Sequence, residues 1–179
     1  MAKVKETPVI YPHQDGRHLP GAKFMKVIGI LAIIFGALGL ISNVVGLIGI
    51  QSLATMSSAD MSEIQEMYNG DFMAQIDLAI AQRSSIIVQI IQSVAQLATG
   101  VMAVIFYKKL KLATPPLIGA IVTIILILIA NILAMSIVGQ FVGMQIISLL
   151  LSCIIPVLLI IACVKKDASL KAAKRITIE

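Results

Sequence analysis

The sequence predicts an all-α polytopic membrane protein, with four transmembrane helices in a compact bundle and a helical hairpin in an outer loop. Composition is the first reason, because 59% of the residues are hydrophobic and only 13% are charged. Soluble domains are nearer half apolar and a quarter charged. The second reason is that no charged residue occurs in 27–59, 84–107 or 112–164. These runs exceed the roughly 20 helical residues that a bilayer core requires, and they lack the period-two alternation of barrel strands.

The charge-free runs divide into four predicted spans. The first two runs hold one span each, at about 27–50 and 84–107. The third run is long enough for two spans, and the glycines of "SIVGQFVG" suit a turn between them. We therefore predict spans at about 116–138 and 144–164. The remaining segments are an N-terminal arm (1–26), an outer loop (51–83) and a basic tail (165–179).

The basic residues predict the orientation. Thirteen of the fourteen lysines and arginines lie in the arm, the 108–115 loop and the tail, whereas the outer loop has only Arg83 beside five acidic residues. Cytoplasmic loops carry such an excess of basic residues. Both termini are therefore expected in the cytoplasm and loop 51–83 outside the cell membrane. An anionic-lipid site is an alternative role for these charges, and their placement argues against nucleic acid as a partner.

The second span carries many polar residues for a lipid-embedded helix. With 3.6 residues per turn, they fall within an arc of roughly 120°. The members of this polar stripe are Ser85, Gln89, Gln92, Ser93, Gln96, Thr99 and Gly100. An unsatisfied amide in hydrocarbon costs several kcal/mol. The stripe is therefore expected to face protein or water.

The other spans carry matching faces of small and polar residues. These faces comprise Gly29, Ala32, Gly36, Gly39, Asn43 and Gly46; Gly119, Ala120, Thr123, Ala130, Asn131 and Ala134; and Gln145, Ser148, Ser152, Pro156 and Cys163. Small residues let helices approach closely, and amides and hydroxyls bond between helices. We expect this helix-packing role for Gln89, Gln92, Gln96, Asn43, Asn131 and Ser152. The alternatives are a polar path along the three glutamines and packing against a second protein or a second copy. No predicted span contains the ionisable residues that proton relays and most ion-coupled carriers place in the membrane.

The outer loop predicts a short acidic helical hairpin. Asp60 and Glu63 have capping-box spacing, and Asn69-Gly70 marks a turn before a second helix that leads toward the second span. The apolar residues of the hairpin include Met61, Ile64, Met67, Tyr68 and Phe72. This face either caps the bundle or docks a partner protein, because methionine-rich faces adapt to varied partners.

The sequence contains few residues that could catalyse a reaction or bind a cofactor or metal. It contains no nucleotide-binding glycine-rich loop with its lysine, no H-E-x-x-H and no G-x-S-x-G. His13, Asp15 and His18 lack the further ligands that a zinc site needs. Cys153 and Cys163 stand about 15 Å apart on one helix, too far for a bridge, which leaves packing roles or palmitoylation of Cys163. We therefore expect no enzyme activity, no cofactor and no metal.

The layout also carries a family resemblance. The pattern "GILAIIFGALGLI", the loop, and "YKKLKL" before two closely spaced spans resemble the small four-helix integral membrane proteins of Gram-positive bacteria. The resemblance implies a membrane fold and no activity. Claudins and tetraspanins share the four spans, but this chain lacks their outer-loop cysteines and tryptophan.

The function expected from these observations is that of an accessory, regulatory or immunity-type membrane protein that acts by protein–protein interaction or self-association in the lipid bilayer. The alternative is a small channel or transporter component with a polar path lined by the second span.

Overall fold

The computed structural model describes residues 16–56, 71–138 and 143–176. The elements in chain order are η1 (Gly16–His18), α1 (Ala22–Ala54), α3 (Asp71–Ala81), α4 (Arg83–Phe106), α5 (Thr114–Val138) and α6 (Gly143–Ile176). All regular elements in these ranges are helical, and four of them, α1, α4, α5 and α6, are long and apolar enough to cross a membrane. For the described residues, the predictions of an all-helical fold and of four helices able to span a membrane are confirmed.

The helix boundaries differ from the predicted spans mainly at the ends. α1 extends beyond 27–50 on both sides, and α6 continues to Ile176 instead of ending near Val164. The predicted arm also overlaps helical structure, because η1 and the first turn of α1 precede residue 27. The predicted hairpin is described only from Asp71, where α3 begins, and Gln82 alone separates α3 from α4. Its first helix lies outside the described residues.

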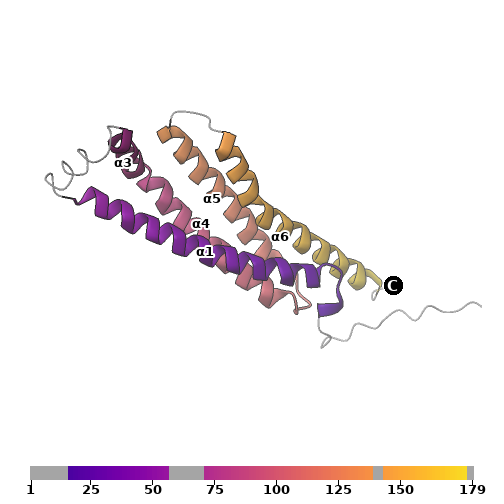
Figure 1. Ribbon diagram of the computed structural model, residues 1–179. Coiled ribbons are helices and arrows are strands. Elements are labelled where there is room, and N and C mark those ends of the chain that lie inside the picture. The colour runs from indigo at the N-terminus through magenta and orange to yellow at the C-terminus, as the bar shows by residue number, and fades with distance from the viewer. Residues whose placement is uncertain (1–15, 57–70, 139–142, 177–179) are drawn as a thin grey trace, which may run out of the picture.

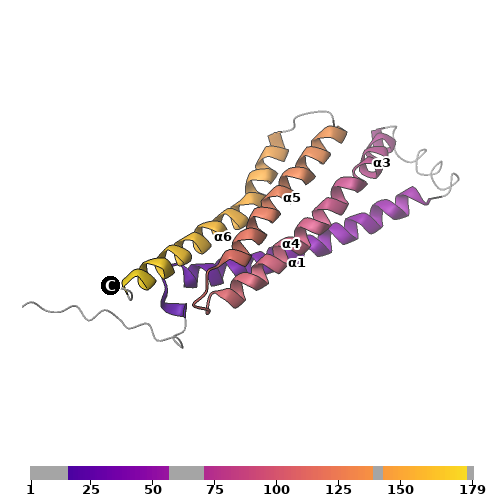
Figure 2. The ribbon, with the colours of Figure 1, turned by 180° about the vertical axis from the view of Figure 1, so that it is seen from behind.

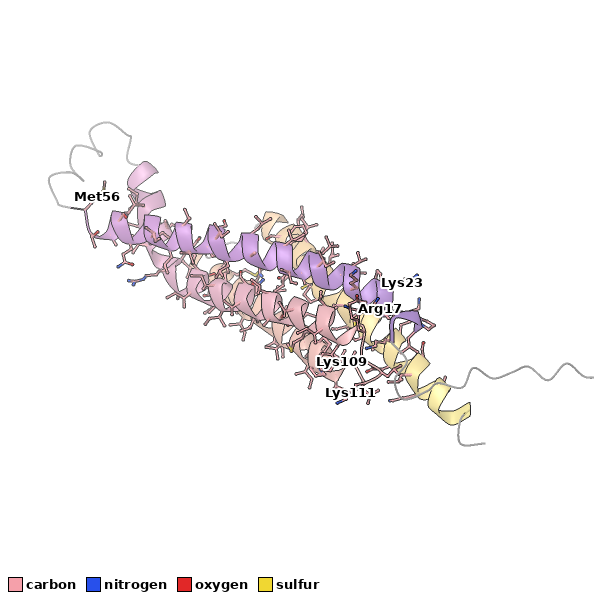
Figure 3. All side chains as sticks on the ribbon, turned by 90° about the horizontal axis from the view of Figure 1, so that it is seen from below. Arg17, Lys23, Met56, Lys109 and Lys111 are labelled. Atoms are coloured by element: carbon pink, nitrogen blue, oxygen red, sulfur yellow. The ribbon has the colours of Figure 1, made fainter. Side chains whose placement is uncertain are left out.

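The four long helices form a ring in the order α1, α4, α5, α6 (Figure 1). Each helix packs against the next, and α6 returns to α1. The α5–α6 pair converges with the α1–α4 pair at one end and diverges from it toward the other, as Figures 1 and 2 both show. The converging end carries Arg17, Lys23, Lys109 and Lys111 and is called the basic end (Figure 3). The opposite end, where Met56 and α3 lie, is called the loop end.

The α1–α4 pair is the most closely packed of the ring, and glycines allow it. A Cβ atom added at Gly36 would lie 2.9 Å from the backbone nitrogen of Leu97. One added at Gly100 would lie 2.7 Å from the carbonyl oxygen of Gly29. Such backbone-to-backbone approach is the packing that small residues permit between membrane helices. The small face predicted for the first span therefore lies against α4 over this stretch.

At the basic end, α6 binds the ends of two neighbouring helices. Lys166 is fully buried, and its Nζ donates to the carbonyl oxygen of Phe106 and, over 3.4 Å, to that of Lys111. The neighbouring Asp167 accepts a hydrogen bond of 2.6 Å from the backbone N–H of Ala113. Phe106 ends α4 and Ala113 directly precedes α5. The lysine and the aspartate therefore hold the α4–α5 connection against α6.

A buried apolar cluster fills the same end. Its members are Met25, Ile28, Ala103, Tyr107, Ala113, Ala120, Leu159, Ala162 and Cys163. The Cys163 thiol is fully buried and donates to the Met25 sulfur over 3.8 Å, which favours the packing role over palmitoylation. η1 adds a further contact, since the Gly16 N–H donates to the Lys108 carbonyl over 2.7 Å. All four helices are thus joined at the basic end.

Candidate functional site

A half-open cleft of about 660 Å³ lies among the four long helices where the two pairs diverge. Its floor comes from α4 and α5, with Gln89, Gln92, Ser93, Gln96, Ala130 and Asn131. One wall comes from α1, with Ile28, Leu31, Phe35, Gly39 and Asn43. The other comes from α6, with Ser148, Leu151, Ser152, Ile154, Ile155 and Leu158. Pockets that bind small ligands in proteins have volumes of this order.

All six polar residues predicted to share the interior line this one cleft. They are Gln89, Gln92, Gln96, Asn43, Asn131 and Ser152. They come from four different helices, so the arrangement requires the ring order of the fold. The structure thus brings the polar stripe of α4 to face the polar residues of α1, α5 and α6 across an open space.

Hydrogen bonds satisfy part of this polar lining. Asn43 donates to the Ser93 hydroxyl over 3.3 Å, which joins α1 to α4. The Gln89 amide donates to Ser85 on its own helix, and Ser85 in turn donates to the Ala130 carbonyl of α5. The other bonds stay within one helix, from Ser93 to the Gln89 carbonyl, from Asn131 to the Ile127 carbonyl and from Ser152 to the Ser148 carbonyl. Among the six predicted residues, Asn43 alone bonds to a second helix within the described chain. The interhelical bonding expected of the set is therefore sparse.

Gln96 and Gln92 differ from the rest of the lining. Within the described residues, neither side-chain amide makes a hydrogen bond. Gln96 is only 9% exposed, and it borders the cleft. A buried amide without a partner loses about 1–3 kcal/mol relative to its solvated state. The floor of the cleft therefore presents unsatisfied donors and acceptors to whatever enters it.

The position of Gln96 places this amide deep in the membrane. It lies thirteen residues after Arg83 and ten before Phe106, the two ends of α4. At 1.5 Å per residue these separations are about 20 and 15 Å. The amide therefore lies near the middle of the span.

The cleft is blind at the basic end. The cleft reaches Ile28 of the buried basic-end cluster, and a separate cavity of only about 10 Å³ lies between Ala32, Gln96, Thr99, Ala120, Thr123 and Leu159, among others. A cavity of this size holds about one water molecule at most. The buried cluster around Met25 and Tyr107 follows directly. The buried cluster thus bounds the cleft at the basic end.

No family model, curated protein or solved structure matches the chain. The chemistry of the cleft follows from its lining. The described lining residues are amides, hydroxyls and apolar side chains, with no charged group among them. Such a surface can exchange hydrogen bonds with an uncharged polar group, whereas it cannot neutralise a phosphate or an ammonium group. The walls also carry apolar side chains that face the surroundings, since Phe35 and Leu151 are largely exposed.

The predicted docking residues Met61, Ile64, Met67 and Tyr68 lie outside the described residues, as does the Phe72 side chain. The apolar walls were not predicted, because Leu31, Phe35 and Leu151 look like ordinary lipid-facing residues in the sequence. Only the divergence of α6 from α1 turns these side chains into the walls of a cleft.

Proposed function

We propose that the protein is an accessory or regulatory membrane subunit, of which an immunity protein is one form, and that it acts by binding a transmembrane segment of another protein in the cleft. The observation that carries this proposal is Gln96, an unpartnered amide that is nine-tenths buried in a cleft open to the surroundings. Residues that served only the chain's own packing would have their hydrogen bonds made internally. An amide left without a partner at this depth instead suits a group supplied from outside.

The blind basic end favours binding over transport. A path across the membrane would have to pass the cluster around Met25, Tyr107 and Leu159. The lining also lacks the ionisable groups that proton relays and most ion-coupled carriers place inside the membrane. The channel or transporter alternative therefore draws support only from the polar character of the floor.

The orientation of the chain in the membrane, the compact bundle and the outer hairpin are further parts of this proposal. The basic end faces the cytoplasm under the positive-inside rule, so the cleft opens in the outer half of the cell membrane. The compact four-helix bundle expected from the sequence is also part of this proposal, with the partner segment packing in the cleft between α1 and α6. The outer helical hairpin, of which α3 is the second helix, provides an additional contact outside the bilayer.

Photo-crosslinking from matched positions tests this function. A photoreactive residue replaces Leu151 on the wall of the cleft or, as the control, Ile132 on the outer face of α5. The two side chains are similarly exposed, at 61% and 64%, and only Leu151 lines the cleft. After illumination of native membranes, we expect one discrete protein adduct from position 151 and none from position 132. Ser148→Trp, which places bulk in the cleft, should reduce that adduct.

Lipid adducts alone from both positions would contradict the proposed function. A protein adduct of equal yield from both positions would also contradict it, because the contact would then not depend on the cleft. Measurable solute flux through purified protein in liposomes, abolished by Gln92→Leu and spared by Gln92→Ala, would favour the transport alternative.

A further inference from the structure

We infer that the cleft recognises a transmembrane helix of a different protein that carries an uncharged hydrogen-bonding side chain, an amide or a hydroxyl, near the middle of the membrane. This inference rests on the proposed function and specifies its partner. The recognising groups are the side-chain amides of Gln96 and Gln92, which have no hydrogen-bond partner among the described residues. Each amide offers two donors and an acceptor to the incoming group.

The depth of Gln96 favours a helix over a lipid. Lipid headgroups lie at the membrane surface, outside the hydrocarbon core of about 30 Å. Gln96 lies near the middle of α4, about 15 Å from the nearer end. The acyl chains that lie at this depth have no hydrogen-bonding group to offer. A transmembrane helix can place a polar side chain at any depth.

The walls of the cleft also suit a helix. On α1, Gly39 and Asn43 line the cleft, and Gly46 follows on the same face. A Cβ atom added at Gly46 would meet no atom within 4 Å, so a neighbouring backbone has room to approach closely. Small residues at such spacing permit close helix contacts. Phe35 and Leu151 add exposed apolar surface on opposite walls.

A second copy of this chain does not have, on the outer faces of its described helices near this depth, the polar side chain that the proposed partner helix requires. Near the level of Gln96, the exposed residues on the outer faces of the described helices are apolar, for example Ile34, Val94 and Ile125. A copy docking by an outer face would therefore bring no hydrogen-bonding side chain to the Gln96 amide. Two copies joined cleft to cleft would place two recesses against each other and leave the space unfilled.

Synthetic peptides in lipid vesicles test the inference even while the natural partner is unidentified. The probe is a lysine-flanked Leu-Ala transmembrane peptide with one central Asn, compared with the same peptide carrying a central Leu. Energy transfer from the labelled full-length protein to the labelled peptide reports binding. We expect the Asn peptide to bind about three- to thirtyfold more tightly, the range of interhelical hydrogen bonds in membranes. Moving the Asn to within one turn of the peptide end should remove the preference.

Gln96→Leu should abolish the preference for the Asn peptide, and Gln92→Leu should reduce it. Both replacements keep the side chain near its original size, and a thermal unfolding curve checks that each variant folds. The matched control is Gln51→Leu, an exposed glutamine of α1 that does not line the cleft, and it should retain the full preference.

Equal binding of the two peptides to the wild-type protein would overturn the inference, as would a preference that survives Gln96→Leu. The proposed function would still stand if position 151 retained its protein adduct. A lipid that copurifies with the wild-type protein and is lost in Gln96→Leu would overturn the inference in favour of a lipid ligand.

Discussion

Lys166 shows how a single residue can hold this fold together. A fully buried cation is costly unless it is paired or well hydrogen-bonded. Lys166 meets this need at the carbonyl end of α4, where helix geometry leaves acceptors free and the helix dipole is negative. Asp167 meets the positive N-terminal end of α5 through Ala113. Two adjacent residues of opposite charge thus bind two helix ends of opposite polarity.

Removing either group should destabilise the basic end. We expect Lys166→Met to lower the free energy of unfolding by about 1–3 kcal/mol, because buried carbonyls lose their donor. Asp167→Ala should lower it by about 0.5–2 kcal/mol, the usual range for a lost N-terminal cap. The control Lys171→Met changes an exposed lysine of the same helix and should stay within about 0.5 kcal/mol of the wild type. Denaturant unfolding in detergent measures all three, and equal stability of Lys166→Met and Lys171→Met would exclude this anchoring role.

At the scale of the helices, α1 and α4 lie in close contact, whereas α1 and α6 diverge toward the loop end. Close backbone approach at Gly36 and Gly100 leaves no room for added atoms. Toward the loop end, α6 turns away from α1, and Gly46 faces free space. The same small face of α1 therefore packs tightly over one half and stays open over the other.

A matched pair of glycine substitutions in α1 tests this difference. Gly36→Ala places a Cβ atom 2.9 Å from the Leu97 backbone. It should therefore lower the free energy of unfolding by about 1–3 kcal/mol, as overpacked cores do. Gly46→Ala adds the same atom where nothing lies within 4 Å, and alanine favours the helix by up to about 1 kcal/mol, so stability should hold or rise. Thermal unfolding in detergent compares the two, and an equal loss in both variants would count against the asymmetric packing.

The helices were predictable from the sequence because charge-free runs report directly on membrane burial. The shared polar face of Gln89, Gln92 and Gln96 was also predictable, since helical periodicity places residues on faces. Periodicity does not report the distance to the next helix. Whether Gln96 meets a partner or an open space depends on how far α5 and α6 diverge, which long-range contacts decide. For the same reason, the sequence shows Lys166 only as one more basic charge of the tail.

At the scale of the whole molecule, the basic end and the loop end differ in structure. The basic end is closed by the apolar cluster and by the bonds of Lys166 and Asp167. Toward the loop end, α6 diverges from α1, as Figures 1 and 2 show, and the cleft lies among the four long helices. Most basic residues of the described ranges gather at the closed end, so the orientation proposed from their charges also sets the side of the membrane that this end faces.

This orientation can be tested with two cysteine variants in a background lacking Cys153 and Cys163. Met56→Cys lies at the loop end and Lys109→Cys at the basic end, and both wild-type side chains are exposed. Under the positive-inside rule, an impermeant thiol reagent should label Met56→Cys on intact cells and Lys109→Cys only after the membrane is opened. A permeant thiol reagent serves as the control, since it should label both positions in intact cells. The reverse labelling pattern would contradict the proposed orientation. It would place the basic end outside the cell and the opening of the cleft in the cytoplasmic half of the bilayer.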